Sequence, residues 1–93
     1  MTNKISVVGL GKLGASMVAG FASKGLDVIG LDKYDKIVEK LNAGISPVEE
    51  TDVQKYITKF SKHISATTDF NYAITNSDIT FVIVPTPSDE RGS

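Results

Sequence analysis

Three glycines near the amino terminus have the spacing of a phosphate-binding turn. Gly9, Gly11 and Gly14 form a G-x-G-x-x-G pattern that follows an apolar run and precedes a segment with helical periodicity. In such a pattern the first glycine permits a tight turn, the second lets the backbone approach a pyrophosphate, and the third lets the helix lie close to the strand. The N–H groups that begin the helix attract the phosphates. The pattern therefore predicts dinucleotide binding.

One acidic residue lies at the distance from the glycines that this chemistry requires. Asp32 follows Gly14 by 18 residues, close to the roughly 20 residues expected for an acid at the end of the second strand. A carboxylate there accepts hydrogen bonds from the adenosine ribose hydroxyls and repels a 2′-phosphate, so it favours NAD over NADP. The same carboxylate is a candidate cap of the following helix, and the two roles are compatible.

The periodicity of the apolar residues predicts strands and helices in alternation around these residues. Strands are expected at 4–8, 27–32, 64–67 and 79–84, and helices at 12–23, at 34–42, from 51 to about 60 and around 70–74. Such alternation predicts a parallel sheet with right-handed crossovers. In the order 3-2-1-4, the glycine turn and Pro85-Thr86 converge at the carboxyl ends of neighbouring strands. We therefore predict an α/β, Rossmann-type sheet with helices on both faces, over 1–93, as part of a domain.

Four local expectations concern single side chains. Leu13 falls on the apolar stripe of the first helix. Gly20 costs that helix about 1 kcal/mol relative to alanine, so a close neighbour is expected to use the space. Thr51 and Gln54 fit a capping box at the start of the third helix. His63 has no carboxylate in evident register and is expected to be a surface residue.

The composition excludes several classes of function. Ten basic and eleven acidic residues give a formal charge of −1, which argues against nucleic acid or an anionic membrane surface as the main partner. No apolar run approaches the roughly 20 residues that span a bilayer. Cysteine is absent, which excludes thiolate catalysis, thiolate metal sites and disulfides within this chain and fits a cytoplasmic location. No metal site is expected.

Four stretches of the chain resemble one family. It is similar to the N-terminal NAD-binding domain of the UDP-glucose/GDP-mannose dehydrogenases in the glycine turn, in Gly30-Leu-Asp32, in residues 41–49 (LNAGISPVE) and in residues 81–87 (FVIVPTP). The last two stretches are the more discriminating, because many dehydrogenases share the glycine pattern. The resemblance covers essentially the whole chain.

The resemblance implies an activity and a set of site residues. Members of the family oxidise the C6 hydroxyl of a nucleotide-linked sugar twice and reduce two NAD molecules. The uronate that they release is used in polysaccharide biosynthesis. The glycines would hold the pyrophosphate, Asp32 the adenosine ribose and Thr86 the nicotinamide side. One departure is Ile37, where relatives often have a cofactor-contacting lysine. The candidate cofactor-binding residues are Gly9, Leu10, Gly11, Lys12, Leu13, Gly14, Asp32, Pro85 and Thr86.

The resemblance also implies that catalysis needs parts outside these 93 residues. Relatives are several hundred residues long and commonly form homodimers. Their nucleotide-sugar site and their cysteine nucleophile lie in the parts of the chain that follow the NAD-binding domain. The chain is therefore expected to be an inactive fragment of an enzyme. Two alternatives stay open: the corresponding domain of a 3-hydroxyacid-type dehydrogenase, and a non-catalytic nucleotide-binding module.

Overall fold

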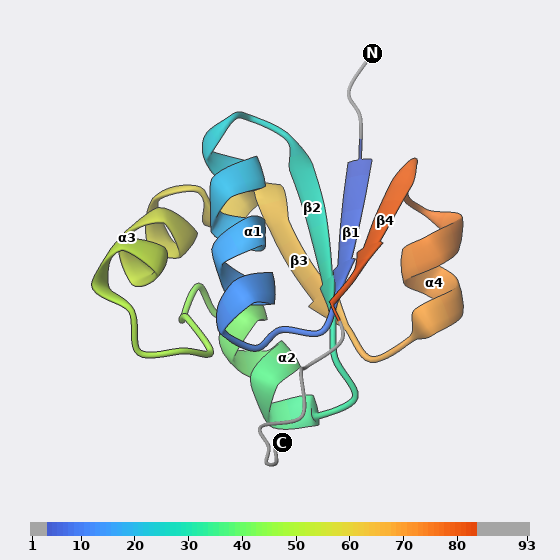
Figure 1. The fold of residues 1–93 in the computed structure, drawn as a ribbon, viewed down its shortest axis with the longest axis horizontal. Helices are drawn as coiled ribbons and strands as arrows, with labels where there is room; N and C mark the ends of the chain where they lie inside the picture. The colour runs from blue at the N-terminus through green and yellow to red at the C-terminus, as the bar shows by residue number, and fades with distance from the viewer. Residues whose placement is uncertain (1–3, 84–93) are drawn as a thin grey trace, which may run out of the picture.

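The computed structural model describes residues 4–83 of the 93-residue chain. They form a four-stranded parallel sheet in the order β3-β2-β1-β4, with helices on both faces (Figure 1). This confirms the predicted order of strands. In chain order the elements are β1 (Lys4–Val8), α1 (Lys12–Ser23), β2 (Asp27–Leu31), α2 (Asp35–Asn42), α3 (Thr51–Lys59), the 3-10 helix η1 (Ser61–His63), β3 (Ile64–Thr67), α4 (Phe70–Thr75) and β4 (Ile79–Val82).

The two faces of the sheet bury different clusters, because side chains alternate along each strand. On one face, Ile5 and Val7 join the main core with residues of α1 and α3. On the other face, Ile29 and Leu31 pack against Ala73 of α4. Figure 1 shows α1, α2 and α3 on one side of the sheet and α4 on the other. The chain thus changes faces after β3, and the strand order reverses between β1 and β4, where such sheets bind ligands.

Small residues let α1 lie close to the sheet, since Ala15, Ala19 and Ala22 are all buried. Leu13 is 60% exposed, so its expected place in the apolar stripe is wrong: Gly14 and Ala15 form the buried side of the first turn, and Leu13 lies off that side. Gly20 has no atom of the described chain within 4 Å of the position that a Cβ would take. The close neighbour expected there is therefore not found.

The loop before α3 is closed by Gln54 rather than by a capping box. Thr51 is the first residue of α3, Glu50 is the N-cap, and no side chain caps the helix. Gln54 Oε1 accepts from the Ser46 N–H (2.7 Å) and Nε2 donates to the Gly44 carbonyl (3.1 Å). The capping-box prediction is wrong because a primary amide both donates and accepts, and this loop presents one backbone group of each kind to it.

The outer edge of β3 is occupied by hydrogen bonds from its own chain. Asn42 Nδ2 donates to the Ala66 carbonyl (3.0 Å), and Asn42 Oδ1 accepts from the Ala66 N–H (2.8 Å). The N–H of Ile64 donates to the carbonyl of Ser61. Asn42 thus ties the end of α2 to the edge of the sheet, which gives this residue of the 41–49 stretch a structural role.

His63 has a carboxylate partner, contrary to expectation. Its Nδ1 lies 3.2 Å from Asp27 Oδ1, and the two side chains are 29% and 42% exposed. The prediction failed because parallel pairing of Val28 with Ile64 places the preceding residues of the two strands side by side, although they are 36 positions apart.

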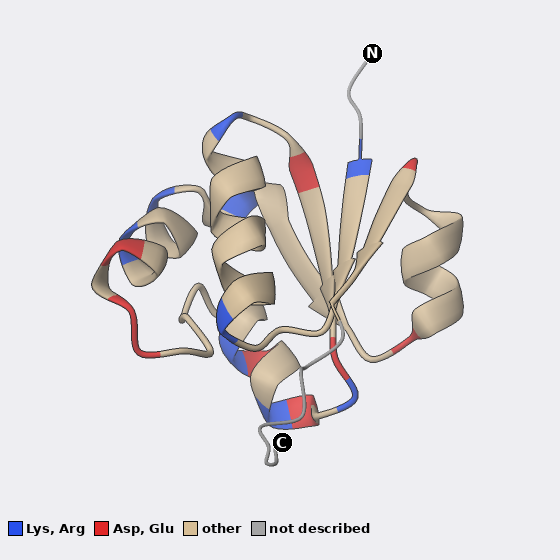
Figure 2. Ribbon diagram, viewed as in Figure 1, with Lys and Arg blue, Asp and Glu red and all other residues tan. Residues whose placement is uncertain are grey.

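The surface of the described part carries charges of both signs. Figure 2 shows acidic and basic residues interspersed over the helices and loops around α1, α2 and α3. No helix in the described range 4–83 is long and apolar enough to cross a membrane. Within the same range, no cluster of three or more His, Cys, Asp or Glu side chains has the arrangement of a metal site.

Candidate functional site

A pocket of about 800 Å³ lies where β1 ends, α1 begins and β2 ends. It is at the carboxyl end of the sheet, beside the point where the strand order reverses. Pro85 and Thr86 lie outside the described residues, and Gly14 lies behind the pocket in the first turn of α1. The predicted site residues that line the pocket are Gly9, Leu10, Gly11, Lys12, Leu13 and Asp32.

Two of the glycines are required by the fold itself. Gly9 has φ 98°, a conformation that side chains with a Cβ rarely adopt. Its N–H donates to the Leu31 carbonyl (2.8 Å), and a Cβ there would lie 2.7 Å from the carbonyl oxygen of Ile83. A Cβ on Gly14 would overlap the carbonyl oxygen of Gly9. The tight turn and the close approach predicted for these positions are both confirmed.

Gly11 differs, because no contact within the described chain requires a glycine there. Its φ of −74° and ψ of −161° suit any residue, and no atom lies within 4 Å of the position of a Cβ. The open space instead leaves the main chain of the turn accessible to a ligand. This is the feature that a pyrophosphate held against bare backbone requires.

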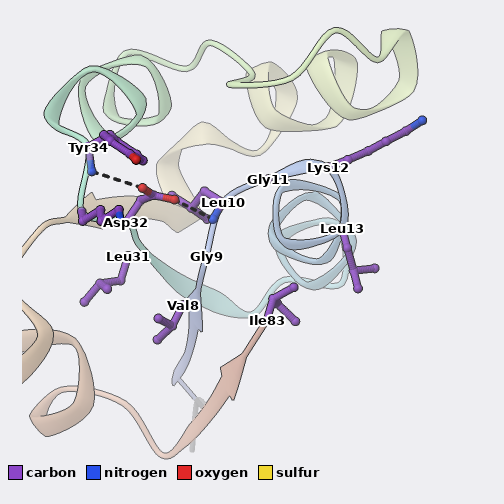
Figure 3. Close-up of a pocket in the computed structure, with 11 residues that line it drawn as sticks. Val8, Gly9, Leu10, Gly11, Lys12, Leu13, Leu31, Asp32, Tyr34 and Ile83 are labelled. Carbon is purple, nitrogen blue, oxygen red and sulfur yellow. Dashed lines mark hydrogen bonds between the residues drawn. The ribbon is translucent and has the colours of Figure 1, made fainter. Parts of the chain in front are cut away.

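The start of α1 has the electrostatic character of an anion site. Gly11 is its N-cap and supplies no side-chain acceptor, and the first turn contains no acidic residue. The first N–H groups of a helix have no partner within the helix. Lys12 stands at the helix end where the dipole favours negative charge. In Figure 3 its side chain extends away from the pocket, so Lys12 offers the pocket its main-chain N–H.

The carboxylate of Asp32 joins the glycine turn to the start of α2. Its Oδ2 accepts from the Leu10 N–H (2.9 Å) and its Oδ1 accepts from the Tyr34 N–H (3.1 Å), as Figure 3 shows. Tyr34 is the N-cap residue of α2, and no side chain caps that helix. The predicted role of Asp32 as a cap is therefore wrong, because its carboxylate bonds the N–H of the N-cap residue itself and not one in the first turn. The bond to Leu10 was not foreseen. A carboxylate has about four acceptor sites, so two remain for the hydroxyls of a ribose.

Lys33 and Tyr34 also line the pocket, although neither was among the predicted cofactor-binding residues. Tyr34 is 58% exposed, and Lys33 Nζ lies 5.2 Å from the centroid of its ring. The sequence feature that points to them is an aromatic residue, Tyr34, within the otherwise polar stretch that follows Asp32. An aromatic ring and a cation at the mouth of a pocket suit a ligand with a planar base.

Comparisons with known proteins agree with this geometry. Residues 3–93 match the family described as the UDP-glucose/GDP-mannose dehydrogenase family, NAD binding domain. The chain is 35% identical to UDP-glucose 6-dehydrogenase AglM of Haloferax volcanii over 97% of its length, and 34% identical to GDP-mannose 6-dehydrogenase of Pseudomonas aeruginosa over 96%. It spans 21% of each of these relatives, about a fifth of their length.

Solved structures show the same relation. A ternary complex of GDP-mannose dehydrogenase from Pseudomonas aeruginosa superimposes with a TM-score of 0.87 at 34% identity, over 96% of this chain and 21% of that one. A UDP-glucose dehydrogenase from Pyrobaculum islandicum gives 0.83 at 32% identity, over 94% and 21%. The predicted resemblance is confirmed, and the chain belongs to the NAD-binding domain of the UDP-glucose/GDP-mannose dehydrogenase family.

Proposed function

We propose that the chain binds NAD in the pocket between the glycine turn and Asp32, as the cofactor-binding part of a nucleotide-sugar 6-dehydrogenase. The observation that carries this proposal is Gly11, which the described protein contacts do not require and which leaves the backbone open in front of the α1 N-terminus. An NAD pyrophosphate fits this position because it is anionic and needs close approach to main-chain N–H groups.

Each residue of the pocket has a defined task in this proposal. Gly9 and Gly14 fix the turn, and Gly11, Lys12 and Leu13 offer main-chain N–H groups to the pyrophosphate. Leu10, whose N–H donates to Asp32, completes the lining of the pocket. Asp32 accepts from the hydroxyls of the adenosine ribose and excludes a 2′-phosphate by charge repulsion. Pro85 and Thr86 are proposed for the nicotinamide side. NAD supplies the hydride acceptor for oxidation of an alcohol.

The activity of the whole enzyme is also a proposal. Relatives that share the domain are a UDP-glucose 6-dehydrogenase and a GDP-mannose 6-dehydrogenase, which supports a nucleotide sugar as the substrate. The chain has no cysteine, so a thiolate nucleophile would have to come from another part of the enzyme. We propose that the whole enzyme is a cytoplasmic homodimer that acts in polysaccharide biosynthesis. We also propose that the 93-residue chain alone does not catalyse the reaction.

Thermal unfolding with each cofactor tests the proposal. NAD is expected to raise the melting temperature of the chain more than NADP does, because a ligand that binds the folded state stabilises it by RT ln(1 + L/Kd), where L is the free ligand concentration, a quantity that is larger for the tighter ligand at equal concentration. Asp32→Ala is expected to abolish the preference, with each shift measured against that variant's own ligand-free melting temperature. Equal shifts from both cofactors in the unaltered chain would contradict the role of Asp32. Mixing the chain with UDP-glucose and NAD is expected to yield no NADH above background.

A further inference from the structure

We propose that Tyr34 is the platform on which the adenine of the cofactor stacks, with Lys33 and Asp32 holding it in position. The inference rests on the proposed function, since it takes the ribose to lie at Asp32. It adds a residue that contributes affinity for the base of the ligand.

The position of Tyr34 follows from the order of groups in the ligand. In the proposed pose the pyrophosphate lies at the glycine turn and the ribose at Asp32. The base is attached at C1′, across the ring oxygen from C4′, which carries the 5′-phosphate arm. The base therefore extends past Asp32, away from Gly11. Lys33 and Tyr34 are the residues that line the pocket directly after Asp32.

The backbone of Tyr34 is fixed while its side chain is free. Its N–H donates to Asp32 Oδ1 (3.1 Å), and its carbonyl accepts from the N–H groups of Ile37 (3.1 Å) and Val38 (3.2 Å). The residue is nevertheless 58% exposed. A large aromatic ring on a rigid backbone, open to the pocket, offers contact area at low cost in conformational entropy.

Lys33 completes the arrangement from one side of the ring. Its Nζ lies 5.2 Å from the ring centroid of Tyr34, a distance at which a cation is attracted to an aromatic face. The 58% exposure of Tyr34 leaves contact area on the residue for a base beside this cation. Tyr72 provides the contrast: it is 50% exposed but belongs to α4, on the opposite face of the sheet, and does not line this pocket.

Binding of ADP tests the proposal on the full chain. Tyr34→Ala is expected to weaken ADP by roughly 5- to 150-fold in calorimetric titration, the range that loss of base–aromatic stacking produces. Tyr34→Phe keeps the ring and is expected to bind as the unaltered chain does. The matched control Tyr72→Ala removes an equally exposed tyrosine and is expected to leave the ADP affinity unchanged. Nuclear Overhauser contacts from adenine H2 or H8 to tyrosine ring protons are expected in the unaltered chain and not in Tyr34→Ala.

The possible outcomes separate this inference from the proposed function. If the unaltered chain binds neither ADP nor NAD, the proposed function fails and the platform fails with it. If the chain binds both and Tyr34→Ala binds ADP equally well, only the platform is overturned. The platform is also overturned if Tyr34→Ala weakens ribose 5-diphosphate, which has no base, as much as it weakens ADP. A circular dichroism spectrum of each variant shows that the fold is retained.

Discussion

Asp32→Ala is expected to destabilise the chain in the absence of any ligand. The usual view of an acid at this position assigns it to the ribose alone, so that its loss would affect binding and not folding. Here the carboxylate accepts from Leu10 in the glycine turn and from Tyr34 at the start of α2. Its removal therefore leaves two backbone N–H groups without their acceptor.

The magnitude follows from the surroundings of the two donors. Leu10 is 1% exposed, and a buried N–H left without a partner costs roughly 1–3 kcal/mol. The bond from Tyr34 is exposed, so water replaces the carboxylate there at a cost of about 0.5 kcal/mol. The sum is about 1.5–3.5 kcal/mol of unfolding free energy, which corresponds to roughly 6–28 °C in melting temperature for a domain of this size.

Urea unfolding followed by circular dichroism measures this loss directly. Asp35→Ala is the matched control, because it removes an exposed carboxylate three residues away in the first turn of α2. It is expected to cost only about 0.3–1 kcal/mol through the helix dipole. Equal stability of the two variants would refute the reasoning. A second readout is 2′,3′-dideoxy-ADP, which lacks the hydroxyls: Asp32→Ala is expected to weaken it too, since the turn loses its support.

Two further predictions concern single positions. Gly11→Ala is expected to lower the unfolding free energy by no more than about 1 kcal/mol, the preference of an N-cap for glycine over alanine, because nothing in the described chain lies within 4 Å of the new Cβ. It is expected to weaken NAD binding at least tenfold by titration calorimetry. Gly20→Ala, equally free of neighbours but remote from the pocket, is expected to leave NAD binding intact. Asn42→Ala is expected to cost about 1 kcal/mol, since water replaces two exposed bonds to Ala66, and to accelerate hydrogen exchange at the Ala66 amide. Unchanged exchange there would contradict the role of Asn42.

Local patterns in the sequence were sufficient to predict the elements and the glycine turn. The apolar runs and the spacing of Gly9, Gly11 and Gly14 each reflect an interaction within one turn or one strand–helix unit, so they can be recognised without a structure. Asp32 was found for the same reason, because its distance along the chain is set by one strand–helix–strand unit.

The expectations that failed depend on contacts between distant segments. His63 meets Asp27 only through the parallel register of β2 and β3. Gln54 does not form the capping box, because its side-chain amide instead bonds two backbone groups of the preceding loop. Leu13 has the spacing of a core residue, but Gly14 and Ala15 form the buried side of its helical turn. In each case the sequence pattern predicted the helix or strand correctly. It did not predict the tertiary contacts of the side chain, because these depend on residues far away along the chain.

The bonds that Asn42 makes to Ala66 also limit how copies of this chain can polymerise. A fibre built by adding strand to strand needs an open edge at each end of every subunit. With the β3 border already hydrogen-bonded to its own helix end, an incoming strand would have to displace that amide first. Edge-to-edge growth is thus terminated on one side, and a single contact through β4, the other border of the described sheet, would end in a pair rather than a filament.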